Sequence, residues 1–250
     1  MSKDLAGKAA FVTGATSGLG RRFARLLADV GASVAIAGRR VDRLETLKAE
    51  IETAGGKCAA VALDVTDAKR IVPALDEAES ALGPIDILVN NAGMNSFGMV
   101  TDLPDEGFDA VMNTNLRGPF FLARETGRRM IARGQGGRII NIASIGTFKV
   151  LPGLTAYCIS KAAIGMMTKC LAREWARHRI NVNAICPGYI ETELNSEWFE
   201  SEGGKKQINS FPRKKLMEEE NLDAMMLLLA SDRSSAITGS LLTVDDGQSL

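Results

Sequence analysis

The chain has 250 residues, 46% of them apolar, and its 30 basic residues balance its 30 acidic residues, so the formal net charge is zero. A neutral chain of this length can bury the core of one α/β domain, and its charge does not indicate nucleic acid or an anionic membrane as a partner. No run approaches the roughly 20 apolar residues of a membrane span, and no signal-peptide pattern begins the chain, so we expect a cytoplasmic protein.

Short apolar or β-branched runs alternate with helical patterns along the whole chain. Nearly continuous apolar strands separated by helices are typical of a parallel sheet that is covered on both faces. No break in composition marks a second domain, so the sequence predicts one α/β domain over residues 1–250. The predicted strands are residues 9–13, 33–37, 58–63, 85–90, 138–143, 180–185 and 241–244.

The first predicted strand leads directly into a glycine-rich stretch, TGATSGLGRR, at residues 13–22. Glycine tolerates positive φ and lets the backbone approach a ligand, and the helix that follows offers free N–H groups to a pyrophosphate. A glycine turn without a ligand is the alternative, but its place between a strand and a helix favours dinucleotide binding. The spacing G-xxx-G-x-G differs from the common G-x-G-x-x-G fingerprint.

A tyrosine and a lysine, Tyr157 and Lys161, lie four residues apart in the segment AYCISKAAIGMMTK. Apolar residues recur there at helical spacing, which predicts that the phenol and the ammonium are neighbours on one helix face. A cation beside a phenol favours the phenolate and lowers its pKa from about 10, toward the range of a useful base. Taken alone, the pair also fits a half-buried tyrosine beside a solvated lysine.

Together these motifs resemble those of the single-domain short-chain dehydrogenase/reductase family over essentially the whole chain. The family's T-G-x-x-x-G-x-G matches residues 13–20, its N-N-A-G matches residues 90–93, and its P-G matches residues 187–188. The resemblance implies a Rossmann-type, doubly wound, seven-stranded parallel sheet with helices on both faces. It also implies a homotetramer built through helices at about 105–132 and 156–177 and through the C-terminal strand. The C-terminal VDDG departs from the family's usual V-D-G-G at Asp246.

The resemblance further implies an oxidoreductase that interconverts a ketone and a secondary alcohol. Tyr157 would be the acid and base, and Lys161 would lower its pKa and hold the nicotinamide ribose. Ser144 would polarise the substrate carbonyl, and Asn115 would hold a water for proton relay. Singly, Ser144 also fits a turn cap at a strand end, and Asn115 fits a helix residue near a disturbance at Gly118-Pro119.

The residues that the resemblance places at the cofactor come from the glycine turn, from the ends of several strands and from the catalytic helix. Asp64 and Val65 would lie at the adenine, and the segment after the sixth strand would meet the nicotinamide. The full predicted set is Gly14, Thr16, Ser17, Gly18, Leu19, Gly20, Arg39, Arg40, Asp64, Val65, Asn91, Ala92, Gly93, Tyr157, Lys161, Pro187, Gly188, Ile190 and Thr192.

The end of the second strand indicates which nicotinamide cofactor is used. Gly38 stands where an acidic residue would bind the ribose 2′-hydroxyl of NAD, and Arg39 and Arg40 follow it. A guanidinium suits a 2′-phosphate in charge and in geometry, so the sequence predicts NADP(H) over NAD(H). The alternative is an ordinary solvated pair of arginines at a helix start.

Residues 188–215 are the expected substrate lid. Met94, Phe97 and Trp198, together with Ser144 and Tyr157, are the predicted substrate contacts, and an apolar pocket suits an acyl chain or a ring better than a sugar. The substrate would be a small ketone or alcohol, such as a 3-oxoacyl thioester of CoA or of a carrier protein. The overall pattern is similar to that of 3-oxoacyl-carrier-protein reductases. This resemblance implies that Arg133, Arg173 and Arg177 lie near the place where an acidic carrier would dock, although charged runs are more often solvated faces.

Other function classes are weighed against this interpretation. A redox-inactive NADP-binding sensor or regulator typically lacks the tyrosine or the lysine, and both are present here. An NAD-linked sugar or steroid dehydrogenase of the same family is the alternative among enzymes. The sequence predicts no metal site, because the four cysteines form no CxxC pair and the single histidine, His178, lies in no ligand cluster.

Overall fold

The computed structural model describes residues 4–191 and 195–250, and its strands form a single parallel sheet, as the sequence predicts. The seven strands lie in the order β3-β2-β1-β4-β5-β6-β7. Because the chain order reverses between β1 and β4, a crevice opens at their carboxyl ends, where ligands bind in folds of this type. The strands are β1 (Ala9–Thr13), β2 (Ser33–Gly38), β3 (Cys58–Ala62), β4 (Ile87–Asn90), β5 (Gly137–Ile142), β6 (Ile180–Pro187) and β7 (Leu241–Val244).

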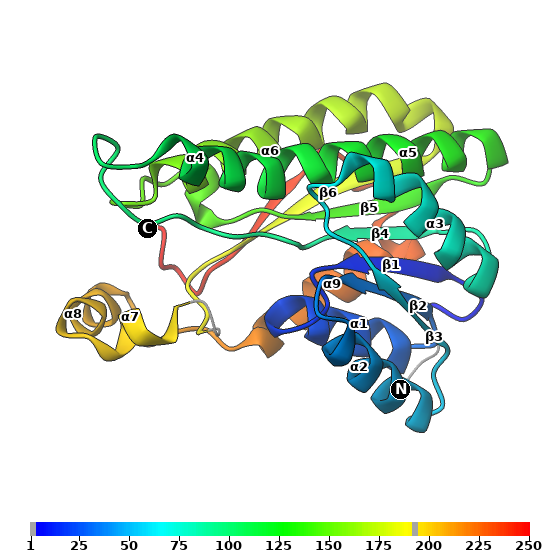
Figure 1. Ribbon diagram of the computed structural model, residues 1–250, viewed down its shortest axis with the longest axis horizontal. Coiled ribbons are helices and arrows are strands. Elements are labelled where there is room, and N and C mark those ends of the chain that lie inside the picture. The colour runs from blue at the N-terminus through cyan, green and yellow to red at the C-terminus, as the bar shows by residue number, and fades with distance from the viewer. Residues whose placement is uncertain (1–3, 192–194) are drawn as a thin grey trace.

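Helices cover both faces of the sheet, and α7 and α8 stand apart from these layers at one end of the molecule (Figure 1). The cores of the two faces confirm this arrangement, because α1, α2 and α9 share one apolar cluster while α3, α5 and α6 share the other. The helices are α1 (Gly18–Asp29), α2 (Val41–Thr53), α3 (Ala68–Leu82), α4 (Asp105–Met112), α5 (Gly118–Arg133), α6 (Thr155–Trp175), α7 (Ser196–Glu200), α8 (Glu202–Ser210) and α9 (Asp223–Ala230).

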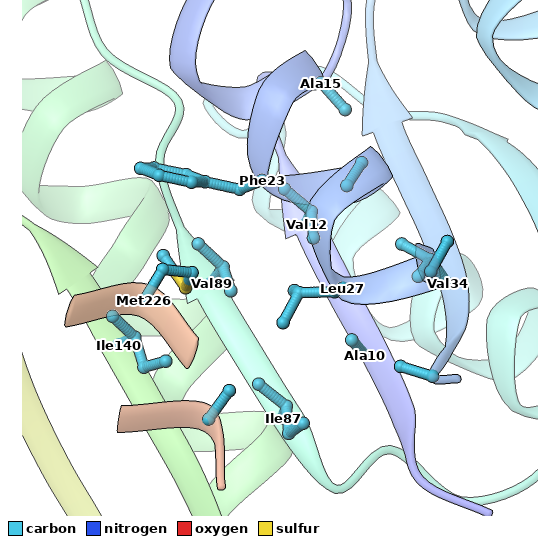
Figure 2. Close-up of a cluster of buried hydrophobic side chains, with 14 of the residues drawn as sticks. Ala10, Val12, Ala15, Phe23, Leu27, Val34, Ile87, Val89, Ile140 and Met226 are labelled. Atoms are coloured by element: carbon cyan, nitrogen blue, oxygen red, sulfur yellow. The ribbon is translucent and has the colours of Figure 1, made fainter. Parts of the chain in front are cut away.

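The strands are apolar at nearly every position because side chains alternate between two buried faces. On β1, Ala10 and Val12 belong to the cluster under α1, whereas Phe11 belongs to the cluster on the opposite face. Figure 2 shows Phe23 and Leu27 of α1 pointing into the first cluster toward β1 and β4. This packing fixes the start of α1 against the carboxyl end of β1, which is where the glycine turn lies.

The helix expected over about 105–132 is interrupted. A π-helical segment, η1 (Asn113–Arg117), joins α4 to α5, so the predicted disturbance beside Gly118-Pro119 is confirmed. A Cβ atom at Gly118 would lie 2.6 Å from the Val65 carbonyl oxygen, which explains why glycine stands at this close contact. Such single π turns insert an extra residue into a helix and often lie at functional sites.

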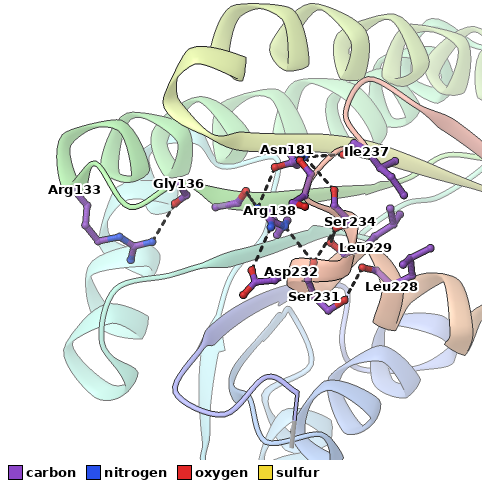
Figure 3. A network of polar contacts seen from close by, with 12 residues as sticks. Arg133, Gly136, Arg138, Asn181, Leu228, Leu229, Ser231, Asp232, Ser234 and Ile237 are labelled. Carbon is purple, nitrogen blue, oxygen red and sulfur yellow. Dashed lines mark hydrogen bonds and ion pairs between the residues drawn. The ribbon is translucent and has the colours of Figure 1, made fainter. Parts of the chain in front are cut away.

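A polar network joins β5 and β6 to the segment between α9 and β7 (Figure 3). Asn181 of β6 donates to the carbonyls of Ser235 and Ile237 at 3.0 and 2.8 Å, so its amide ties the segment before β7 to the sheet. Arg133 donates to the Asp86 carboxylate at 2.9 Å and is only 16% exposed. Its guanidinium is therefore engaged within the chain, while docking of an acidic carrier near Arg133 stays a prediction. In residues 4–191 and 195–250, no helix has the length and apolar character needed to cross a membrane.

Candidate active site

A cleft of about 1210 Å³ lies at the carboxyl ends of the strands and is lined by most of the residues predicted for the cofactor and substrate. Among the described members of the predicted cofactor set, Gly20 does not line it. Gly20 is buried behind the turn, where a Cβ atom would lie 2.2 Å from the Gly14 carbonyl oxygen, so its role is to let the turn close. Thr192 lies outside the described residues.

The glycine turn has the geometry of an anion site. Gly14 and Gly18 have φ of 66° and 51°, in the left-handed region that favours glycine. Ser17, before α1, makes no side-chain cap to the helix, and the first turn of α1 carries no acidic residue. The N–H groups and the positive end of the helix dipole therefore face the cleft without an internal counter-charge.

The N-N-A-G segment is joined to this turn by hydrogen bonds. The Thr13 hydroxyl accepts from the backbone N–H groups of Asn91 and Ala92, both at 3.0 Å. The Asn91 side chain returns a hydrogen bond to the Thr13 carbonyl at 3.0 Å. Asn91 therefore joins the carboxyl ends of β1 and β4 by hydrogen bonds, and it also lines the cleft.

The two arginines after β2 occupy different positions. Arg40 donates to the hydroxyls of Thr16 and Ser17 at 2.7 and 2.8 Å, so its guanidinium lies against the glycine turn. Arg39 is 79% exposed and lies 4.0 Å from the Asp64 carboxylate. Burial opposes ionisation of Asp64, but hydrogen bonds from Thr66 and the charge of Arg39 outweigh it and hold the pKa of that carboxyl below its usual value.

Gly38 could not carry an acidic side chain without rearrangement. A Cβ atom there would lie 2.7 Å from the Thr16 methyl group, closer than carbon atoms pack. The end of β2 therefore offers two guanidinium groups to a ribose, with no carboxylate at the Gly38 position to oppose them.

The predicted catalytic side chains Ser144, Tyr157 and Lys161 line one part of the cleft. Ser144 caps the short helix η2 (Ile145–Thr147), its hydroxyl accepting from the Gly146 N–H at 3.0 Å, and it is hydrogen-bonded to Tyr157. Helix α6 places the ammonium of Lys161 5.5 Å from the centre of the Tyr157 ring, as the four-residue spacing predicts. Lys161 donates to the Ile142 carbonyl at 2.7 Å and is 5% exposed.

The acid–base properties of this group correct one expectation. Burial raises the pKa of Tyr157, and the hydrogen bond to Ser144 offsets this only in part. Burial also lowers the pKa of Lys161 to about 8. The sequence predicts a Tyr157 pKa lowered by Lys161, but desolvation dominates in the folded chain. The residues of the chain thus hold Tyr157 as a phenol that can donate a proton.

Asn115 faces inward from the π segment and braces the loop after β4. Its side-chain oxygen accepts from the Met94 N–H and its amide donates to the Met94 carbonyl, both at 2.8 Å. The amide also donates to the Ser160 hydroxyl at 3.0 Å, and that hydroxyl donates to the Tyr157 carbonyl. Asn115 thus connects the loop after β4 to α6, while its role in a water relay stays a prediction.

The substrate half of the cleft lies between the loop after β4 and the lid, residues 188–215. Met94, Phe97 and Trp198 line it as predicted, and the ring centres of Phe97 and Trp198 lie 6.2 Å apart. The lining that completes this half is mostly apolar and includes Met99, Leu151, Leu154, Ile190 and Phe199.

Sequence reasoning missed the polar residues of this half, which are Asn95, Thr114, Tyr189, Asn195 and Gln207. Gln207 is hydrogen-bonded to Tyr189 and accepts from the Trp198 indole N–H at 2.7 Å. Tyr189 is the second of only two tyrosines and directly follows the P-G motif, so its position was a usable signal. Asn95 and Gln207 carried none.

Charge is distributed unevenly in the cleft. Among the described lining residues, the charged side chains are Arg39, Arg40, Asp64 and Lys161, and all belong to the predicted cofactor set. The described part of the substrate half presents hydroxyl, amide and apolar groups. Residues 4–191 and 195–250 contain no group of three or more His, Cys, Asp or Glu side chains placed to hold a metal ion.

Comparisons with known proteins agree with this geometry. The model of the short chain dehydrogenase family matches residues 8–203. An NAD-dependent glycerol dehydrogenase of Listeria innocua is 38% identical over 99% of this chain and 96% of its own. A 3-oxoacyl-[acyl-carrier-protein] reductase of Thermotoga maritima is 35% identical over 97% and 98%. The crystal structure of a gluconate 5-dehydrogenase from Burkholderia cenocepacia, in complex with NADP and tartrate, superposes with a TM-score of 0.94, at 34% identity, over 98% of this chain and 96% of its own.

Proposed function

The chain belongs to the short-chain dehydrogenase family, and we propose that it is an NADP(H)-dependent member that interconverts a neutral, largely apolar ketone and its secondary alcohol. As a family member it is an oxidoreductase of CH–OH groups. The observation that carries the proposal is the meeting of Ser144, Tyr157 and Lys161 in one cleft with the glycine turn and the apolar lid.

The proposed reaction divides the chemistry between cofactor and chain. NADPH, when bound, supplies the hydride to the carbonyl carbon. The Ser144 hydroxyl donates to the carbonyl oxygen, and the Tyr157 hydroxyl gives its proton to that oxygen as negative charge develops there. Lys161 holds the ribose, and Asn115 connects the site to water that restores the proton on Tyr157. In the reverse direction the tyrosine is the base.

Preference for NADP(H) is supported by the end of β2. A 2′-phosphate beside Arg39 and Arg40 would gain charge-assisted hydrogen bonds that a 2′-hydroxyl cannot match. We expect Arg39→Asp to lower the ratio of kcat/KM with NADPH to kcat/KM with NADH about tenfold or more, since a charged hydrogen bond is lost and a like charge faces the phosphate. The measurement is initial rates with both cofactors at one fixed ketone concentration.

The matched control for this prediction is Arg43→Asp, in the first turn of α2. Arg43 is exposed and does not line the cleft, so the same reversal of charge there leaves the cofactor ratio unchanged. An Arg39→Asp protein that keeps the wild-type ratio would contradict the assignment of Arg39 to the 2′-phosphate.

The substrate class is inferred from the lining of the substrate half. A substrate carboxylate would lose its hydration there without gaining a cationic partner among the described residues, and an unpaired buried charge is costly. We expect 3-oxoacyl thioesters or apolar ring ketones to react with kcat/KM about a hundredfold above that of 5-ketogluconate. For uncharged sugar ketones we expect kcat/KM values between those of the apolar ketones and that of 5-ketogluconate. The measurement is NADPH oxidation across this panel, and it is the first experiment to make.

Two outcomes of the panel would contradict the proposal. The highest kcat/KM on 5-ketogluconate would assign the substrate half to sugar acids, as in the gluconate dehydrogenase relatives. Tight NADPH binding without turnover of any ketone would instead favour a redox-inactive sensor. Comparing kcat/KM for the same 3-oxoacyl group on a carrier protein and on CoA separates recognition of the carrier from recognition of the acyl chain.

We also infer a cytoplasmic homotetramer. Large apolar side chains are exposed on the outer helices, with Phe120 of α5 41% exposed and Ile159 and Met166 of α6 46% and 60% exposed. Large apolar side chains exposed on outer helices are consistent with a contact between subunits. All four cysteines are free thiols, which suits a reducing compartment.

A further inference from the structure

The residues after β7 fold back into a tight turn beside the lid. Asp245 accepts hydrogen bonds from the Gly247 N–H at 3.0 Å and from the Ser249 N–H at 2.8 Å. Asp246 and Gly247 have φ of 53° and 81°, and aspartate is one of the few non-glycine residues that tolerate this region. The departure from V-D-G-G at Asp246 therefore leaves the turn intact. This turn directs Gln248 inward, where it is only 3% exposed.

Gln248 joins three separate segments of the chain. Its side-chain oxygen accepts from the Tyr189 N–H at 2.6 Å, and its amide donates to the Lys215 carbonyl at 3.3 Å. These are the first and the last parts of the lid. Its backbone carbonyl accepts from the Lys149 ammonium at 2.7 Å, in the loop that follows Ser144.

Other contacts also bring the two ends of the lid together at this place. The Met217 N–H donates to the Tyr189 carbonyl at 3.0 Å, and Arg213 pairs with Asp246 at 3.1 Å. A Cβ atom at Gly188 would lie 2.3 Å from the Gln248 side-chain oxygen, so the approach of Gln248 depends on glycine there. Figure 1 shows the C-terminal end on the same side of the molecule as α7 and α8.

The backbone held by Gln248 carries a ring of the substrate half. The Tyr189 ring stacks on Phe211 at 5.3 Å and meets Phe199 edge to face at 6.0 Å. Tyr189 and Phe199 both line the cleft. Gln248 therefore holds the backbone of a residue that lines the substrate half, although Gln248 itself does not line the cleft.

We propose that Gln248 is a positioning residue that fixes both ends of the lid and thereby sets the geometry of the substrate half. It acts through the backbone of Tyr189 and does not itself line the cleft. The effect on substrate rests on the proposed function, while the effect on the lid rests on the contacts of Gln248 alone.

The test compares Gln248→Met with the wild-type protein, because methionine keeps the volume and removes both polar contacts. We expect the KM for the ketone to rise about tenfold, with kcat changed less than about threefold and the Kd for NADPH unchanged, since about two hydrogen bonds are lost. Trypsin should cut the exposed lid residues Lys205 and Lys206 about tenfold faster, because the lid opens more often.

The matched control is Gln135→Met, an exposed glutamine at the opposite end of the sheet, which should change neither KM nor lid cleavage. Wild-type cleavage together with a wild-type KM in Gln248→Met would overturn the proposal. A Gln248→Met protein in which NADPH binding and thermal stability fall as much as KM rises would also overturn it, because that is general destabilisation. If the wild-type protein reduces no ketone, the proposed function fails, and the trypsin comparison still decides the role of Gln248.

Discussion

Replacing Tyr157 with phenylalanine is expected to lower kcat for ketone reduction about a thousandfold, while the Kd for NADPH changes less than about twofold. The substitution removes only the hydroxyl that is hydrogen-bonded to Ser144, and general acid catalysis typically contributes about 10²- to 10⁴-fold. The ring remains to pack over the Lys161 ammonium, which lies 5.5 Å from its centre. Cofactor binding should therefore survive the loss of the proton donor.

The other tyrosine of the chain provides the control. Tyr189→Phe also removes one phenol from the same cleft, but we expect it to change KM more than kcat, because its ring belongs to the lid. Both variants are measured by NADPH oxidation, and NADPH affinity is measured by titration of nucleotide fluorescence. A Tyr157→Phe protein that retains more than about a tenth of the wild-type kcat would rule out Tyr157 as the proton donor.

The raised pKa of Tyr157 also gives the direction of the pH dependence. Since the free chain favours the phenol, the proton donor stays protonated as the pH rises through neutrality. The Tyr157→Phe protein has no such group, so any pH dependence that remains in it comes from other residues.

The fold could be predicted from the sequence because its signals are local and repeated. Each strand is a short apolar run whose residues alternate between two buried faces, and each boundary carries a glycine, a proline or a polar residue. The glycine turn and the Tyr157–Lys161 pair were equally accessible, since strand, turn and helix fix their spacing. The seven parallel strands and the placement of Lys161 beside Tyr157 are therefore confirmed.

Properties that arise from distant contacts could not be predicted. The pKa of Tyr157 depends on how fully the fold excludes water, and burial reverses the direction that the adjacent lysine suggests. In the sequence Arg133 has the character of a surface cation, and only the fold brings Asp86, from the loop before β4, beside it. Gln248 carries no motif at all, and its contacts become visible only when the C-terminal turn meets both ends of the lid.

Lys161 should show the second large effect, with activity and stability changing in opposite directions. Burial lowers its pKa from the model-peptide value of 10.5 to about 8, so between these pH values the unfolded chain binds more protons than the folded chain. The free energy of unfolding of the wild-type protein therefore rises with pH across this window, and the charged buried lysine destabilises the fold below about pH 8. The full difference corresponds to about 3 kcal/mol.

Lys161→Met removes this penalty and also removes the donor to the Ile142 carbonyl, which costs about 1 kcal/mol. At pH 7 the variant should therefore be about 1–3 kcal/mol more stable than the wild-type protein, and this advantage should disappear as the pH approaches 10.5. Activity should fall at least about a hundredfold, because the ribose contact and the proton path are lost together.

Urea unfolding of the cofactor-free proteins at pH 7 and at pH 9.5 measures the difference in the free energy of unfolding between variant and wild type. Because all other titrating groups are common to both proteins, their contributions cancel in this difference. Lys169→Met is the matched control, since Lys169 is exposed on the same helix two turns further along and should change neither stability nor activity in this way. A Lys161→Met protein less stable than the wild type at pH 7 would mean that the ammonium is stabilised by the fold. In that case Lys161 would contribute to the stability of the fold as well as to the proposed reaction.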